Sequence, residues 1–328
     1  DLSEAIEIGL PMPDHFPQSG RATQGAAKML RAYVYMTKPN REYAKAEQDL
    51  KDITKMGYSL EEDYARVFDP SNKNGKESIF EVQYLDGEGG QHSNIPWRCI
   101  PRCTNTDFLM GVRCDNYGGS NAGNNVPTEE LIQSYEPGDK RLPISVHIAE
   151  GTLDGDLFTV DKLVTEDIAD YTVPAGKAFR YFCSKYYHPP YVYPDQAGDN
   201  FPLYRYSGAL LLLAESLVEQ GKEAEALPYL NQVRERAGLK PLTVATKQNV
   251  SDEMRHELAF ENHRWTDLIR TGQAVSVMNE YGKEMKRLYG WILPSAFNVT
   301  KERLIFAFNK RELEINDKLV QNPGYKDY

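Results

Sequence analysis

The sequence predicts a mainly α-helical protein in which paired helices carry long loop insertions and a few short strands. Two observations lead to this fold class. Apolar residues recur at helical spacing in residues 23–57 and 203–238, and a break divides each segment into two helices. Residues 86–127, by contrast, show no apolar periodicity and are rich in glycine and asparagine.

The first pair of helices is expected within residues 23–57, on either side of the sequence KPN. Each helix shows apolar residues three or four positions apart, which places them on one face. These residues are Ala27, Leu30 and Val34 in the first helix and Tyr43, Ala46, Leu50 and Ile53 in the second.

The second pair is expected within residues 203–238, where Gly221 separates the helices. Its apolar residues are Leu210, Leu213, Ala214 and Leu217, then Leu227, Leu230, Val233 and Ala237. The second helices of the two pairs match in order, since Ala46, Leu50 and Ile53 correspond to Ala226, Leu230 and Val233. A small residue followed by larger ones lets antiparallel helices pack closely, as in tetratricopeptide-like units. Pro228 is expected to distort its helix.

Two insertions and a strand are expected between the helix pairs. The sequence ESIFEVQYL alternates at Phe80, Val82 and Tyr84, which predicts a short strand. Residues 86–127 follow as a long loop, and loops of such length in compact proteins are usually functional or mobile. Residues 188–202, rich in proline and tyrosine, form a second insertion.

The segment MRHELAFENHRWTDLIRTG is expected to belong to one helix that is capped at Ser251 and ends near Gly272. Its apolar side consists of Leu258, Trp265, Leu268 and Ile269. Opposite charges stand three residues apart in two pairs, Glu261 with Arg264 and Asp267 with Arg270. These charges are expected to have a structural role.

The same segment begins like the zinc-protease motif H-E-x-x-H, with His256 and Glu257. The second ligand should stand four residues after the first, but that position is Phe260, and the next histidine is His263. Seven helical residues rise by about 10 Å, which is too far for one shared zinc ion. A zinc hydrolase is therefore not predicted.

Composition and charge argue against nucleic-acid binding and against a membrane-spanning segment. The 328 residues are 41% hydrophobic and 26% charged, as in ordinary globular proteins, and the formal net charge of −10 argues against nucleic-acid binding. No apolar run approaches the ~20 residues that span a bilayer. No segment resembles a secretion signal, so the chain is either cytoplasmic or lacks its natural N-terminus.

Cysteines and catalytic motifs predict no metal, cofactor or enzyme activity. The spacing of Cys99, Cys103 and Cys114 matches no zinc motif, although a disulfide within this group stays open, and Cys183 stands apart. The sequence contains neither a G-x-S-x-G elbow nor a G-x-x-x-x-G-K-S/T loop. The sequence GEGG follows the predicted strand without opening a helix, which excludes a dinucleotide fingerprint.

Several motifs, in order along the chain, resemble those of the SusD/RagB family. They are KESIFEVQYL (76–85), VPTEELIQSYEPGDKR (126–141), FPLYRYSGALLLLAESLVEQGKEAEAL (201–227), LNQVRERAGL (230–239), ELAFENHRWTDLIRTG (257–272) and QNPGY (321–325). One departure is FNKRELEIN (308–316), where members usually carry a Pro-Ile-Pro-like segment. The resemblance covers nearly the whole chain.

The resemblance implies a single SusD-like domain over residues 1–328 that lacks its natural N-terminal part. It implies non-catalytic capture of an oligosaccharide at the bacterial surface in Bacteroidetes, as in starch-utilisation systems. The family works with a SusC-like TonB-dependent transporter in the outer membrane and is held there by a lipid anchor, which this chain would lack. The alternatives are peptide capture, a helical glycoside hydrolase and a scaffold that binds only protein.

The expected ligand residues lie in the insertion 86–127. Trp97 and Tyr117 offer flat faces for sugar rings, and Arg98, Asn116 and Asn121 offer planar hydrogen-bonding groups for hydroxyls. Two alternatives stay open: Trp97 could pin the loop to the scaffold, and the asparagines could serve turns.

A second aromatic candidate lies near the C-terminal end. Trp291, with Tyr289, stands in the sequence YGWILP, but its apolar neighbours favour packing in the core over ligand contact.

Overall fold

The structure is a computed structural model of the chain, and it describes residues 1–13, 20–114 and 122–326. These residues form two compact units, Asp1–Glu261 and Asn262–Tyr328, and each is described by itself. The expectation of a single domain over residues 1–328 stays a prediction.

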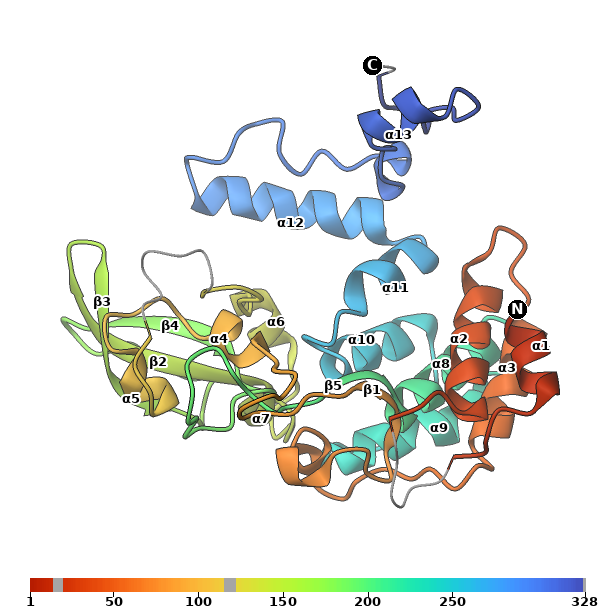
Figure 1. The fold of residues 1–328 in the computed structure, drawn as a ribbon, viewed down its shortest axis with the longest axis horizontal. Coiled ribbons are helices and arrows are strands. Elements are labelled where there is room, and N and C mark those ends of the chain that lie inside the picture. The colour runs from red at the N-terminus through yellow and green to blue at the C-terminus, as the bar shows by residue number, and fades with distance from the viewer. Residues whose placement is uncertain (14–19, 115–121, 327–328) are drawn as a thin grey trace. The chain divides into compact units, whose positions relative to one another are not determined.

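Unit 1 contains a layer of long helices and a separate three-stranded sheet (Figure 1). Its helices are α1 Leu2–Ile8, α2 Gln24–Thr37, α3 Tyr43–Ile53, α4 Ile95–Cys99, α5 Thr106–Met110, α6 Glu129–Ser134, α7 Leu142–Ser145, α8 Tyr206–Val218, α9 Glu223–Arg236 and α10 Lys247–Glu257. Helices α2, α3, α8 and α9 follow one another side by side in the layer, and α10 packs on α8. The predicted helical fold class is confirmed.

The matched residues of α3 and α9 face the core of the helix layer. Ala46, Leu50 and Ile53 are fully buried, as are Ala226, Leu230 and Val233. Helix α8 lies between neighbours on several sides, and all of its 13 residues are buried. Helix α9 continues through Pro228 from Glu223 to Arg236.

The predicted apolar face of α2 is wrong at two of its three residues. Leu30 and Val34 are 41% and 46% exposed, whereas Met29, Ala32 and Met36 are buried in the core. The helix carries two apolar stripes. The stripe of Met29, Ala32 and Met36, which are small or unbranched residues, is the one that packs in the core of the helix layer. Spacing alone does not distinguish two such stripes.

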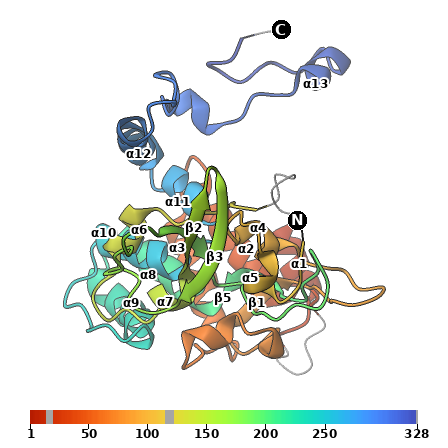
Figure 2. The same cartoon turned by 90° about the vertical axis from the view of Figure 1, so that its left-hand side faces the viewer.

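Among the described residues, five strands form two antiparallel sheets. Strands β1 (Ser78–Val82) and β5 (Phe201–Arg205) pair with each other, so the predicted strand at ESIFEVQYL is confirmed. Strands β2 (Val146–Asp154), β3 (Leu157–Val164) and β4 (Ala178–Cys183) form the other sheet in the order β3-β2-β4. Figure 2 shows β2 and β3 as a long hairpin.

Residues 86–127 contain two short helices, α4 and α5, which the prediction of a plain loop missed. Five-residue helices carry too few apolar positions to show periodicity. Apolar residues from these helices pack against the three-stranded sheet and form a second core with Phe158, Val160 and Phe182. The described part of the insertion is thus anchored to the sheet.

The single helix predicted from Ser251 to Gly272 is wrong, because two helices occupy this segment. Helix α10 is capped by Thr246, whose Oγ1 accepts from the Asn249 backbone at 3.1 Å, and it ends at Glu257. The next helix, α11, begins at Arg264. Phe260 and Asn262 between them have positive φ angles of 68° and 65°, which no helix accommodates.

Unit 2 consists of α11 (Arg264–Arg270), α12 (Ala274–Leu288) and α13 (Lys310–Ile315) with connecting loops. The predicted pair of Asp267 and Arg270 is present, with 3.0 Å between Oδ1 and Nη2. Trp291 is 80% exposed, and its ring lies 5.9 Å from that of Tyr289. The expected core packing of Trp291 is therefore not found within this unit.

Candidate functional site

The insertion 86–127 is closed at its base by a short stretch of pairing, here called the loop stem and made of residues 98–102 and 122–124. The Gly123 amide donates to the Ile100 carbonyl at 2.8 Å, and the Asn124 amide donates to the Arg98 carbonyl at 2.8 Å. Arg102 Nε donates to the Ala122 carbonyl at 3.4 Å. The stem fixes where the residues between its two sides begin and end.

Trp97 occupies the second core rather than the surface. Its side chain is 2% exposed, and its ring lies 6.0 Å from that of Tyr191 at an angle of 51°. Its indole Nε1 has no hydrogen-bond partner among the described residues. This position corresponds to the alternative in which Trp97 pins the loop, and a sugar could reach its face only after the surrounding chain moved.

The remaining predicted ligand residues divide into two groups. Arg98 lies in the last turn of α4 and is exposed, and its carbonyl accepts the Asn124 amide in the loop stem. Asn116, Tyr117 and Asn121 lie outside the described residues. Ala122, which follows Asn121 in the sequence, is the first described residue after them and belongs to the loop stem.

The second insertion, residues 188–202, packs directly on the first. Ser93 and Ala197 exchange backbone hydrogen bonds of 2.8 and 2.9 Å, and the Tyr191 amide donates to the Met110 carbonyl at 2.8 Å. The Tyr187 hydroxyl donates to the Leu109 carbonyl. Both insertions were predicted from the sequence, but their association was not, because neither insertion carries a periodic pattern.

A histidine–aspartate pair lies at the start of the second insertion, and no sequence motif predicted it. His188 Nδ1 lies 2.5 Å from Asp199 Oδ1, and the His188 side chain is 30% exposed while that of Asp199 is 5% exposed. The His188 amide donates to the Tyr191 hydroxyl at 2.8 Å. This pair fixes the histidine ring and joins both ends of the insertion.

A buried ion network lies between the helix layer and the sheet. It consists of Arg141, Lys185, Arg205, Arg234 and Arg236 with Glu77, Asp139, Glu253, Glu257 and Glu261. Arg205 lies at its centre and contacts Glu77 at 2.7 Å, Glu257 at 2.9 Å and Glu261 at 2.7 Å. Every side chain in this set is less than a tenth exposed.

The cations of this network keep Glu257 ionised. Burial by itself would raise the pKa of Glu257, but the positive charges of Arg236, Arg205 and Arg141 hold that pKa well below its usual range. Burial lowers the pKa of Lys185 despite the ion pair with Glu261 at 2.8 Å. The structural role predicted for the charge of Glu261 agrees with this arrangement, although Lys185 and Arg205, which bind it, lie far away in the sequence.

His256, the first residue of the zinc-like motif, also belongs to the packed interior. Its Nε2 lies 2.9 Å from the Ser134 hydroxyl, and its ring lies 4.5 Å from that of Tyr135. Burial and the nearby Arg141 charge lower the pKa of His256 to about 4. No group of three or more His, Cys, Asp or Glu side chains in residues 1–13, 20–114 and 122–326 could hold a metal ion.

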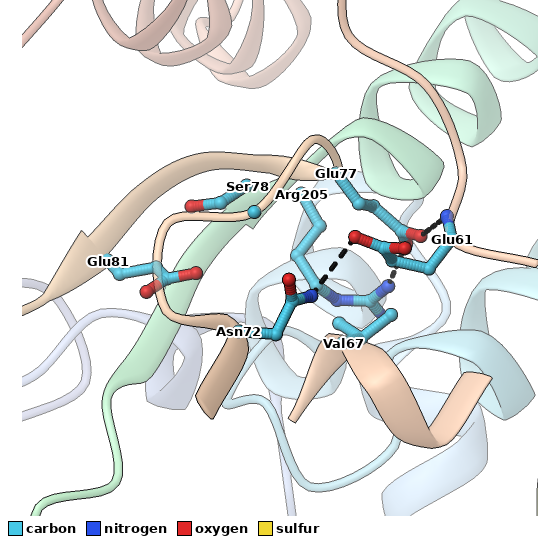
Figure 3. Close-up of a pocket in the computed structure, with 8 residues that line it drawn as sticks. Glu61, Val67, Asn72, Glu77, Ser78, Glu81 and Arg205 are labelled. Carbon is cyan, nitrogen blue, oxygen red and sulfur yellow. Dashed lines mark hydrogen bonds and ion pairs between the residues drawn. The ribbon is translucent and has the colours of Figure 1, made fainter. Parts of the chain in front are cut away.

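The small cavity in Figure 3 has a volume of about 10 Å³, which is roughly the space of one water molecule. Glu61, Glu77, Glu81 and Arg205 are among its lining residues. An oligosaccharide does not fit such a space.

The four cysteines are free thiols, so the disulfide left open for the 99–114 group is not formed. Cys183, which stands apart in the sequence, hydrogen bonds with Cys99 inside a buried cluster. This hydrogen bond lowers the pKa of Cys99, whereas burial raises the pKa of Cys183 well above its ordinary value.

Comparisons with known proteins agree on one family. Residues 169–325 match the SusD family. The SusD-like protein P2 from Formosa agariphila is 25% identical over 96% of this chain and 62% of its own length, so the chain spans less than two thirds of that relative.

Two solved structures share the fold. Surface glycan-binding protein A from Bacteroides fluxus is 25% identical, with a TM-score of 0.73 over 99% of this chain and 68% of that chain. A laminarin-binding SusD-like protein is 26% identical, with a TM-score of 0.68 over 99% of this chain and 67% of that chain. Together with the ordered motifs and the paired helices, these matches show that residues 169–325 belong to the SusD family and that the chain has a SusD-like fold.

Proposed function

We propose that this protein captures an oligosaccharide at the bacterial cell surface without cleaving it and delivers it to a SusC-like TonB-dependent transporter. The observation that carries the proposal is the similarity, over nearly the whole chain, to proteins described as glycan-binding and laminarin-binding. The place of action is the outer face of the outer membrane. In the part of the chain that the structure describes, no helix has the length and apolar character that a membrane crossing requires.

The ligand surface of this proposal is centred on the loop stem. Arg98 provides planar donors there, and Asn116, Tyr117 and Asn121 are proposed to contact the saccharide from the adjoining part of the loop. Trp97 supports the stem from within the second core, and it becomes a ring platform only if the loop opens. Anchoring the loop to a rigid sheet limits the entropy that ligand binding costs.

Native gel electrophoresis through gels that contain polysaccharide tests the capture step. The chain is run through separate gels with laminarin, starch and pectin, beside a non-binding protein of similar size. We expect at least one polysaccharide to retard the chain, and Arg98→Ala to reduce that retardation. Migration identical to the reference protein in every gel, together with binding to a peptide mixture, would show that the ligand class is wrong.

A further inference from the structure

Unit 2 carries a loop, residues 289–299, that follows the C-terminal end of α12 (Figure 1). Two turns shape its first part. The Ile292 amide donates to the Tyr289 carbonyl at 3.1 Å. The Ala296 amide donates to the Leu293 carbonyl at 2.9 Å. This segment, here called the aromatic loop, is therefore folded by its own backbone.

The far end of the aromatic loop is fastened to α12. The Asn279 side chain exchanges two hydrogen bonds of 2.9 Å with the Val299 backbone. Phe297 lies against the helix at Gly282, where an added Cβ atom would be 2.2 Å from the Phe297 Cβ, so only glycine fits there. A loop held at both ends has few positions available to its exposed side chains, which lowers the entropy that binding costs.

Two side chains of the aromatic loop form an exposed ring pair. Trp291 and Tyr289 are both exposed, and their ring centroids lie 5.9 Å apart with an angle of 42° between the planes. Tryptophan side chains are mostly buried in folded proteins, and exposed aromatic rings are typical of binding surfaces. The two rings therefore stand side by side on a surface that can receive a ligand.

Polar side chains accompany the ring pair. Lys286 lies one helical turn before Tyr289, which makes the two residues neighbours. Lys286 Nζ donates to the Pro294 carbonyl at 2.9 Å and to Asn298 Oδ1 at 3.4 Å. Ammonium and amide groups of this kind can donate to sugar hydroxyls. The aromatic loop thus combines flat apolar faces with hydrogen-bond donors.

We propose that Tyr289 and Trp291 form a second saccharide-binding site, in which sugar rings stack on the two aromatic faces. The inference rests on the proposed function, since it takes its ligand class from saccharide capture, but it uses no residue of the insertion 86–127. The C–H groups on one face of a pyranose ring pack on the electron-rich face of an aromatic ring, while the hydroxyls bind polar neighbours. Two rings tilted against each other fit a glycan that turns between consecutive sugars.

An apolar protein partner is the alternative occupant of this surface. Such a partner would also contact Leu293, which is exposed in the same loop. A sugar ring gains little from leucine, because a branched aliphatic side chain offers no flat face. Leu293→Ala is therefore the matched control, since it removes exposed apolar area from the loop and leaves both rings in place.

Quenching of tryptophan fluorescence by acrylamide tests the inference. The chain has three tryptophans, and Trp291, at 80% exposure, is far more accessible than Trp97, at 2%, or the half-buried Trp265. Hexasaccharides from laminarin, starch and pectin are titrated against the chain at a fixed acrylamide concentration. We expect at least one of them to protect the fluorescence in a saturable way. Trp291→Phe should abolish this protection, which assigns the signal to Trp291.

Variants that keep Trp291 as the reporter identify the contacts. Tyr289→Ala should raise the hexasaccharide concentration at half protection about tenfold, because it removes one of the two stacking faces. Leu293→Ala should leave that concentration unchanged. The circular dichroism of both variants should match that of the parent protein, because both side chains are exposed.

The outcomes separate the two proposals. Retardation in the polysaccharide gels without protection of Trp291 overturns the inference and leaves saccharide capture intact. Equal shifts for Leu293→Ala and Tyr289→Ala would also overturn the inference, because they would indicate an apolar docking surface. The lack of both retardation and protection removes both proposals.

Discussion

Arg205 and Glu261 form a buried bidentate ion pair, with 2.7 Å between Nε and Oε2 and 2.8 Å between Nη2 and Oε1. Arg205 ends β5 and immediately precedes α8, whereas Glu261 follows α10. Lys185 binds the same carboxylate at 2.8 Å from just beyond β4. The pair therefore joins the helix layer to the segment that leads from the sheet into the second insertion.

Glu261→Ala should reduce the free energy of unfolding by about 3–5 kcal/mol, because it removes the carboxylate that Arg205 and Lys185 share and leaves their charges buried. Urea unfolding followed by circular dichroism measures the change. Glu130→Ala provides the control, since its exposed pair with Arg255 should contribute less than about 1 kcal/mol. Equal losses of unfolding free energy in the two variants would show that the buried ion pair stabilises the protein no more than the exposed pair does.

Acid should destabilise the protein through His256. The pKa of its folded state is about 4, below the value of 6.5 for an unperturbed histidine, so the unfolded state binds the proton more readily. Stability from this residue is complete above pH 6.5 and falls as pH drops towards 4. Between pH 7 and 5 the loss should be about 2 kcal/mol.

His256→Gln removes this titration and can still hydrogen bond with Ser134. Between pH 7 and 5 the variant should therefore lose about 2 kcal/mol less stability than the parent protein. Chemical denaturation at pH 7, 6 and 5 measures both proteins. Parallel pH profiles would mean that His256 does not carry the effect.

Trp97→Ala should reduce the free energy of unfolding by about 3–5 kcal/mol, because it removes a large side chain from the second core. Trp97→Phe should retain most of the stability. Phe108→Ala is the control in the same insertion, because its side chain is 49% exposed and should cost at most about 1 kcal/mol. A Trp97→Ala protein that is as stable as the parent yet loses saccharide would restore the platform role.

The thiol count tests the state of the cysteines. A protein prepared without reductant and then unfolded should release four titratable thiols, since all four cysteines are free. Alkylation before unfolding should reach Cys114 first, because Cys99, Cys103 and Cys183 are buried. Mass spectrometry after alkylation gives the sites, and a count of two would reveal a disulfide that the structure lacks.

Local periodicity predicted the helix pairs because their buried residues repeat within a few turns. The positions of Ala46, Leu50 and Ile53 and of Ala226, Leu230 and Val233 follow directly from such spacing. Periodicity predicted the wrong buried face for α2, because Leu30 and Val34 repeat as regularly as the buried Met29 and Met36 do. Nothing in the spacing of an isolated helix tells which of two stripes meets its neighbours.

Long-range contacts explain what the sequence did not reveal about the site. Glu261 has an oppositely charged residue three positions away, yet it binds Lys185 and Arg205, 76 and 56 residues distant. The four-residue spacing of Glu253, Glu257 and Glu261 was the signal that could have suggested a buried charged face. Trp97 gave no such signal, because its core forms between two insertions without periodic pattern.

The most direct test of saccharide capture is to incubate the chain with a bound hexasaccharide and to measure both the complex and the recovered sugar. We expect saturable binding in the titration, and chromatography of the released sugar should return only the hexasaccharide. Shorter sugars in the recovered fraction, or the lack of any saturable complex, would contradict it.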